Sequence, residues 1–146
     1  GVQVEIARER ITAESGGRLA AGCDLIIDAL DNLETRYILN RVAQELQVPL
    51  VHGAVHGFEG RVMTVLPGRT ACLMCLYRGV TLGGTFPVLG TTPAVVAAIQ
   101  VTEAVKYFTG LGDLLAGRFL VYDGLRMRFA EVRVERDPGC AVCGGK

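Results

Sequence analysis

The hydrophobic pattern at the start of the chain changes from strand-like to helical and back. Residues 2–6, VQVEI, alternate apolar and polar side chains, which predicts a strand. Residues 12–22 then predict a short helix with Thr12 as its N-cap, since a threonine hydroxyl can accept a hydrogen bond from a free amide of the first turn. Residues 23–30, CDLIIDAL, form a continuous apolar run, which is typical of a strand covered on both faces.

A longer helix is predicted directly after this buried strand, over residues 31–47. Its apolar side chains recur at helical spacing, and the helix ends before Pro49, which cannot continue it. Asp31 and Glu34 have the spacing of a capping box, in which two side chains satisfy the first free amides. A buried strand followed at once by a helix favours an α/β fold.

Two strands joined by a short connection follow this helix. Residues 49–57 and 60–68 are both largely apolar, and the segment between them is too short for a crossover. An antiparallel hairpin is therefore expected, so the sheet is predicted to be mixed. Residues 68–92 contain several glycines and little periodicity, which indicates a long connection of the kind that often carries function.

A second long helix is predicted over residues 93–110, with a proline in its first turn and Gly110 at its end. Its polar side chains Gln100, Glu103 and Lys106 form one narrow stripe, and nearly all other positions are apolar. This pattern predicts a helix that is largely buried.

The end of the chain predicts a second hairpin. Residues 117–124 and 127–135 read as strands, and Asp123-Gly124 is a strong turn signal between them. Together the elements predict one α/β domain whose mixed sheet is flanked by helices.

Composition narrows the class of protein further. Half of the 146 residues are hydrophobic, which is enough for the core of one compact domain. The 15 basic and 15 acidic residues balance, so charge offers no argument for a nucleic-acid partner. The first residues lack the pattern of a secretory signal, and no apolar run is long enough to span a membrane. We therefore expect a cytoplasmic protein that binds neither nucleic acid nor membrane.

Four of the five cysteines form two C-x-x-C pairs, Cys72 with Cys75 and Cys140 with Cys143. In a reducing compartment such pairs bind metal or do redox work more often than they form lasting disulfides. Each pair can supply one edge of a tetrahedron, which predicts a structural zinc site that ties the middle of the chain to its end. A redox dithiol and unrelated reduced cysteines are the alternatives. Cys23 is expected to be a small buried side chain.

Acidic and histidine side chains near the strand ends are candidates for other chemistry. Asp28 and Asp31 lie at the carboxyl end of a predicted parallel strand, where ligands bind in open α/β sheets and an acid can hold magnesium on nucleotide phosphates. Asp31 could equally be a helix cap. His52 and His56 share one face of a strand and could ligate one metal, although packed histidines are the commoner outcome.

Six segments taken in order resemble the later part of the ThiF/MoeB/HesA family: DLIIDALDNLETRYILN, VPLVHGAVHGFEGRVMTVLPG, CLMC, EAVKYFTG, FLVYDGLRMRF and PGCAVCGG. The resemblance covers nearly the whole chain. It implies a Rossmann-like fold, a homodimer, and structural zinc held by the two C-x-x-C pairs. It also implies an adenylyltransferase that uses ATP and magnesium to activate the C-terminal glycine of a ubiquitin-like sulfur carrier protein, in thiamin or molybdopterin biosynthesis and related routes.

The resemblance also implies roles for individual residues. Asp31 matches the acidic residue of the family's magnesium-triphosphate site and is the implied catalytic carboxylate. Asn32, Arg36 and Asn40 match the pattern beside it and are implied cofactor-binding residues. The implied zinc ligands are Cys72, Cys75, Cys140 and Cys143.

The chain departs from the family's pattern at two places. The strand, G-x-G-x-x-G loop and helix with which members begin, and the ATP-holding residues that follow, have no counterpart here. Residues 1–146 are therefore expected to be the C-terminal part of an adenylating domain and to be inactive alone. Many relatives have a cysteine where this chain has Phe86, which argues against a cysteine-relay step. The alternative function is a noncatalytic, zinc-stabilised module that binds a carrier protein or a second subunit.

Overall fold

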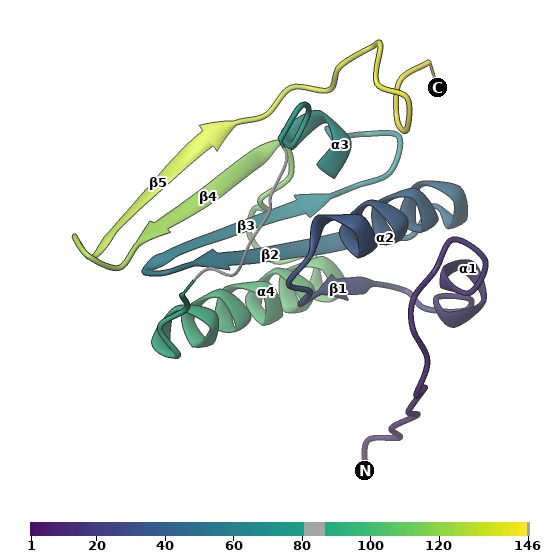
Figure 1. Ribbon diagram of the computed structural model, residues 1–146, viewed down its shortest axis with the longest axis horizontal. Coiled ribbons are helices and arrows are strands. Elements are labelled where there is room, and N and C mark those ends of the chain that lie inside the picture. Colours follow the sequence, from purple (N-terminus) through teal and green to yellow (C-terminus); the bar gives the residue numbers. More distant parts are fainter. Residues whose placement is uncertain (81–86, 146) are drawn as a thin grey trace.

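The computed structural model describes residues 1–80 and 87–145, which form a sheet with helices on both faces (Figure 1). In chain order the elements are α1 (Gly16–Leu19), β1 (Ile26–Asp28), α2 (Leu33–Leu46), β2 (Leu50–His56), β3 (Glu59–Val65), α3 (Leu73–Leu76), α4 (Thr91–Thr109), β4 (Arg118–Asp123) and β5 (Arg128–Arg133).

The sheet is mixed, as the sequence predicts. Its order is β1-β2-β3-β4-β5, with β1 parallel to β2 and every other pair antiparallel. Both predicted hairpins, β2–β3 and β4–β5, are confirmed. The second turn is longer than the expected two residues, because Asp123 accepts hydrogen bonds from the amides of Leu125 and Arg126.

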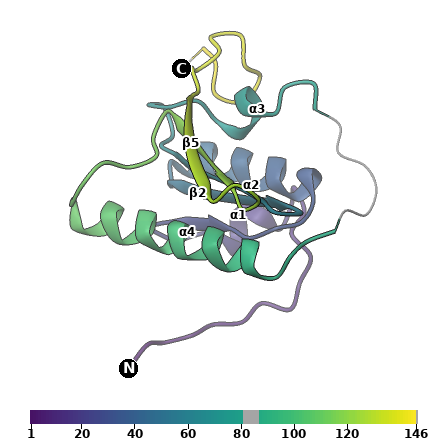
Figure 2. The same ribbon diagram turned by 90° about the vertical axis from the view of Figure 1, so that its left-hand side faces the viewer.

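Side chains alternate between two cores on opposite faces of the sheet. Leu50 and Met63 belong to one core, which also contains α2, α3 and the C-terminal cysteines. Their neighbours Val51 and Val62 belong to the other core, beneath α4. Figure 2 shows this layering, with α4 on one side of the sheet and α2 and α3 on the other.

Helix α4 lies on the sheet with its polar stripe inward, so the prediction that it is largely buried is wrong. Gln100 and Glu103 are 4% and 1% exposed, whereas Val105 and Phe108 are 54% and 61% exposed. Gln100 donates to the carbonyls of Asp28 and Val51 at 2.9 and 3.1 Å. The buried polar side chains of Gln100 and Glu103 on α4 are paired with backbone or side-chain partners, which removes most of the cost of burying them.

Glu103 anchors the same helix further along. Its carboxylate accepts from the Thr64 hydroxyl at 2.5 Å and from the Leu115 amide at 2.7 Å, and it pairs with Lys106. Two glycines make room for the helix, because a Cβ on Gly53 would lie 2.5 Å from the Gln100 amide group and one on Gly60 would lie 2.6 Å from Val96. Among the described residues, no helix has both the length and the apolar character needed to cross a bilayer.

Two local predictions near the N-terminus are also wrong, whereas the predicted long connection is confirmed. Residues 2–6 form no strand and are exposed, since no neighbouring strand lies beside them in the described sheet. Helix α1 begins after Ser15 rather than Thr12, because Thr12 and Ser15 bond each other's amides in a turn before it. The connection 68–92 contains α3 and the first turn of α4, which starts at Thr91.

Replacing Gly53 by alanine is expected to lower the free energy of unfolding by about 1–3 kcal/mol, because the new Cβ displaces the Gln100 amide from its two carbonyl partners. Gly17→Ala is the matched control, since a Cβ there has no neighbour within 4 Å. Denaturant unfolding of the two variants measures the difference, and equal stabilities would contradict the close packing of α4.

Candidate functional site

A buried ion pair holds the loop that follows β1. Asp28 is fully buried, and its carboxylate lies 3.2 Å from the Arg36 Nε atom and accepts from the Leu30 amide at 3.0 Å. The Arg36 guanidinium also donates to the carbonyls of Leu30 and, at 2.8 Å, of Gly53. A buried ion pair is tolerated when further hydrogen bonds satisfy both groups, as they do here. The result is a fixed turn at the carboxyl end of β1.

His52 extends this network across the sheet. Its Nδ1 lies 2.6 Å from Asp28 and its Nε2 lies 2.8 Å from the Tyr77 hydroxyl. A carboxylate can only accept, so Nδ1 carries the proton and Tyr77 donates to Nε2. Burial lowers the pKa of His52, partly offset by Asp28, and burial raises the pKa of Tyr77, so both side chains stay neutral. His52 is thus a packed, hydrogen-bonded histidine, while His56 is exposed at the strand end.

Asp31 lies just beyond this turn and is exposed. The predicted Asp31–Glu34 capping box is wrong, because Asn32 is the N-cap of α2 and its side chain accepts from the Thr35 amide at 2.9 Å. Among the described residues, the Asp31 carboxylate accepts only from the neighbouring Asn32 side chain, at 3.1 Å. Its carboxylate therefore remains available to a ligand instead of serving as a cap.

A small cavity of about 160 Å³ lies between this turn and the start of α4. Ala29 and Leu30, the residues before Asp31, line one side, and Pro93 of α4 lines another. Gly53 and Ala54 of β2 also contribute, so small side chains border much of the cavity. Its place at the carboxyl ends of two parallel strands is the usual ligand position in open α/β sheets.

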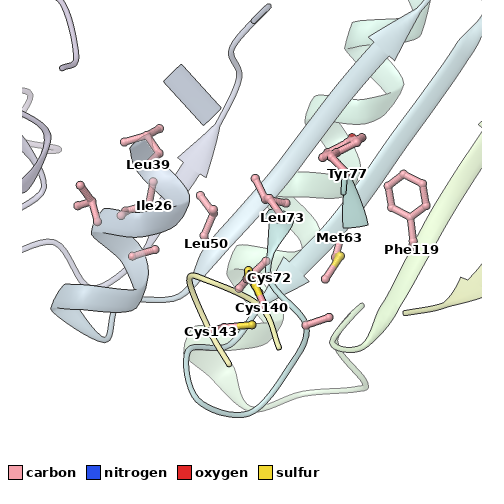
Figure 3. Close-up of a cluster of buried hydrophobic side chains, with 14 of the residues drawn as sticks. Ile26, Leu39, Leu50, Met63, Cys72, Leu73, Tyr77, Phe119, Cys140 and Cys143 are labelled. Carbon is pink, nitrogen blue, oxygen red and sulfur yellow. Dashed lines mark hydrogen bonds between the residues drawn. The ribbon is translucent and has the colours of Figure 1, made fainter. Parts of the chain in front are cut away.

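The four paired cysteines converge on the other side of the molecule. Their sulfurs all lie within 4.8 Å of one another. Two close separations cross between the pairs, 3.7 Å from Cys72 to Cys140 and 3.4 Å from Cys75 to Cys143. Figure 3 shows Cys72, Cys140 and Cys143 gathered beside Leu73 and the apolar core. The convergence argues against unrelated reduced cysteines, and the contacts between pairs favour one shared centre over a separate dithiol in each pair.

This geometry fits a zinc ion. Zn–S bonds of about 2.3 Å place the sulfurs of a tetrahedral site about 3.8 Å apart, which is close to the two separations measured here. The donor set of four thiols is that of closed structural zinc sites, in which the metal stabilises the fold and takes no substrate. Cys72, Cys75, Cys140 and Cys143 would hold the ion.

In both pairs, amides two and three residues further on act on the first cysteine. Burial raises the pKa of the Cys72 thiol, against hydrogen bonds from the Met74 and Cys75 amides that lower it. For Cys140, burial also raises the pKa, but hydrogen bonds from the amides two and three residues further on bring it to about 7. Amides directed at the first sulfur of each pair favour the thiolate that a metal requires.

Other contacts hold the tail in place. The Arg136 guanidinium donates to the Cys143 carbonyl at 2.9 Å and to the Gly68 carbonyl at 3.1 Å, so it bridges the two parts of the chain that carry the cysteines. The sequence offers no signal that distinguishes Arg136 from the other arginines. Tyr77 was also missed, although its position two residues after Cys75 places it beside the same loop.

The implied site residues fall into two separate groups. Asp31 and Asn32 are exposed at the carboxyl end of β1. The buried Arg36 holds the turn before them by donating to the Leu30 carbonyl. Asn40 is fully buried beside Leu73, near the cysteines rather than the cavity. Phe86 lies outside the described residues. The expectation that Cys23 is buried is wrong, since this free cysteine lies exposed before β1.

The fold and the cysteine cluster together define a Rossmann-like α/β protein with a candidate four-cysteine metal centre. The ThiF family model matches residues 1–142, and the chain belongs to that family.

Similar proteins agree with this assignment. The chain is 40% identical over 149 residues to the SAMP-activating enzyme E1 of Haloferax volcanii, covering 98% of the chain and 55% of that enzyme. It is 38% identical over 154 residues to the sulfur carrier protein adenylyltransferase of Thermus thermophilus, covering 98% of the chain and 57% of that enzyme. The chain thus spans little more than half the length of these relatives.

A solved structure shares the fold at low sequence identity. E. coli MccB with MccA-N7isoASN superposes with a TM-score of 0.83 at 16% identity, over 96% of this chain and 46% of MccB. At this identity the likeness concerns the fold alone.

Replacing Gly144 by alanine is expected to weaken metal binding by at least about tenfold, because its Cβ would lie 2.4 Å from the Pro138 carbonyl and 2.5 Å from the Cys140 carbonyl. Gly139→Ala is the matched control in the same turn, where the nearest atom is the Asp137 carboxylate at 3.3 Å. Zinc content and competition with a chelator measure the effect. Unchanged zinc affinity in Gly144→Ala would contradict the metal centre described here.

Proposed function

We propose that the chain is the C-terminal part of an ATP-dependent enzyme that adenylates the C-terminal glycine of a ubiquitin-like sulfur carrier protein. The observation that carries this proposal is the exposed Asp31 carboxylate on a rigidly held turn beside the small cavity. The names of the two relatives, a SAMP-activating enzyme and a sulfur carrier protein adenylyltransferase, support the class of reaction.

The chemistry needs positioning and charge neutralisation more than it needs an acid or a base. The carrier's terminal carboxylate attacks the α-phosphorus of ATP, pyrophosphate leaves, and an acyl-adenylate forms. Asp31 would hold magnesium, which neutralises phosphate charge when it is bound. Asn32 lies beside it, and Arg36 fixes the turn through Leu30 and Asp28. The small side chains of the cavity leave room for a narrow chain end such as a terminal glycine.

The proposed reaction depends on the cellular location of the protein and on residues beyond those described here. A cytoplasmic location would keep the thiols reduced and available for structural zinc. Residues 1–146 alone are expected to be inactive, since the glycine-rich loop of the family is absent from them. Each lost charge-assisted phosphate contact is worth about 1.5–3 kcal/mol. We therefore expect nucleotide binding to need residues other than these 146, and the relatives are longer than this chain.

Asp31→Asn is expected to reduce ATP–pyrophosphate exchange by about tenfold to a hundredfold, because one charged ligand to the metal-phosphate group is lost. Glu34→Gln, which removes an exposed acid at the start of α2, is the matched control and should keep full exchange. The assay uses the full-length protein with a carrier ending in glycine. Exchange that is indifferent to Asp31, with carrier binding that persists without ATP, would favour a noncatalytic interaction module.

The proposed enzyme is a homodimer, and the exposed apolar face of α4 supports an association of this kind. Val101, Val105 and Phe108 recur at helical spacing on that face, each more than half exposed. Val105→Asp is expected to weaken self-association by at least about tenfold, because a charge would be buried in the interface. Thr102→Asp, on the same helix, is the control. Sedimentation equilibrium measures both, and a protein monomeric at every concentration would contradict the dimer.

A further inference from the structure

Asn40 has a position in the structure that binding to a nucleotide does not explain. Its side chain is 0% exposed, so it has no surface to offer a ligand in the cavity. It extends from α2 toward α3, where its Oδ1 accepts from the Leu73 amide at 2.9 Å. Leu73 directly follows Cys72, and Cys72 is also 0% exposed.

The orientation of the Asn40 amide follows from this contact. A backbone N–H can only donate, so the atom facing Leu73 must be the oxygen, and the Nδ2 group must point the other way. Nδ2 is one of two buried side-chain nitrogens without a partner among the described residues. An orphaned buried donor of this kind costs about 1–3 kcal/mol unless it finds an acceptor.

The Cys72 sulfur is the candidate acceptor, because Cys72 is buried and directly precedes the Leu73 amide that Oδ1 holds. Burial is the largest influence on the pKa of the Cys72 thiol and raises it, while hydrogen bonding from the Asn40 side chain is the first influence that opposes burial. The geometric observation is that Oδ1 of the same amide group is held 2.9 Å from the Leu73 amide, which directly follows Cys72. A thiolate bound to a metal is a stronger acceptor than a neutral thiol, because it keeps part of its negative charge.

We propose that Asn40 is a positioning residue of the metal centre: its Oδ1 fixes the first turn of α3, and its Nδ2 donates a hydrogen bond to the metal-bound Cys72 sulfur. This inference rests on the proposed metal at the four cysteines. It moves Asn40 from the nucleotide site, where the family resemblance alone would place it, to the metal site. Donors to ligand atoms orient the ligands and commonly change metal affinity by about tenfold to a hundredfold.

Asn40→Asp isolates the donor, since aspartate keeps an oxygen for the Leu73 amide but replaces Nδ2 with a second oxygen. We expect the zinc affinity, measured by competition with a chelator, to fall about tenfold to a hundredfold. In the cobalt-substituted protein the sulfur-to-cobalt absorption band should move to longer wavelength, because the Cys72 thiolate loses a donor and becomes more electron-rich.

Gln44→Glu is the matched control. Gln44 lies one turn further along α2, is 3% exposed and has the other orphaned nitrogen, but among the described residues its side chain, unlike that of Asn40, makes no hydrogen bond to α3. The same change from amide to acid there should cost stability and leave the zinc affinity and the cobalt spectrum unchanged. Equal losses of zinc affinity in the two variants would overturn the proposal.

A direct measurement on the unaltered protein covers the case in which Asn40→Asp does not fold. With ¹¹³Cd in the metal centre, NMR should detect a scalar coupling between the cadmium and a side-chain amide proton of Asn40, transmitted through the Cys72 sulfur. Bound cadmium without this coupling would overturn the role of Asn40 and leave the metal centre intact. An unaltered protein that binds neither zinc nor cadmium would overturn both.

Discussion

The contact between the two C-x-x-C pairs determines how the second half of the chain closes. Strand β5 is exposed along its whole length, and the tail beyond it contains no helix or strand in the described residues. The tail is held by the cysteine cluster and by Arg136 across Gly68 and Cys143. Zinc binding to such a site is worth on the order of 10 kcal/mol, as much as the whole stability of a typical domain. Folding of the tail would therefore be coupled to metal binding at the four cysteines.

On the opposite face of the sheet, buried polar side chains hold the packed helix in place. There α4 is held by Gln100 and Glu103, which bond backbone carbonyls, an amide and the Thr64 hydroxyl. Polar anchors of this kind fix the position of a helix more narrowly than apolar packing alone, because each requires a particular partner. The consequence of this arrangement is an apolar outer face, of the kind that marks protein interaction sites.

The sequence predicts the large features of this fold because each has a local cause. The α2 periodicity, the β2–β3 and β4–β5 hairpins and the paired cysteines are all visible in short windows. The orientation of α4 has no local cause. A polar stripe on a helix normally faces solvent, and this one faces the sheet only because Asp28 and Thr64 supply hydrogen-bond partners there. The N-cap of α2 was misplaced by one residue because Asp31 and Asn32 are both good caps, and geometry alone decides between them.

The candidate catalytic turn and the candidate metal centre lie at separate places in the fold, and a series of buried hydrogen bonds connects them. Asp28 holds the turn before Asp31, His52 bonds Asp28, and Tyr77 bonds His52 from the loop that carries the first cysteine pair. Each hydrogen bond in this series holds its two side chains in one arrangement, because the side chains are buried and have no alternative partners in water. Displacement of the metal loop would thus withdraw Tyr77 and loosen the turn that presents Asp31. A structural metal at the four cysteines would in this way influence how precisely the turn presents Asp31.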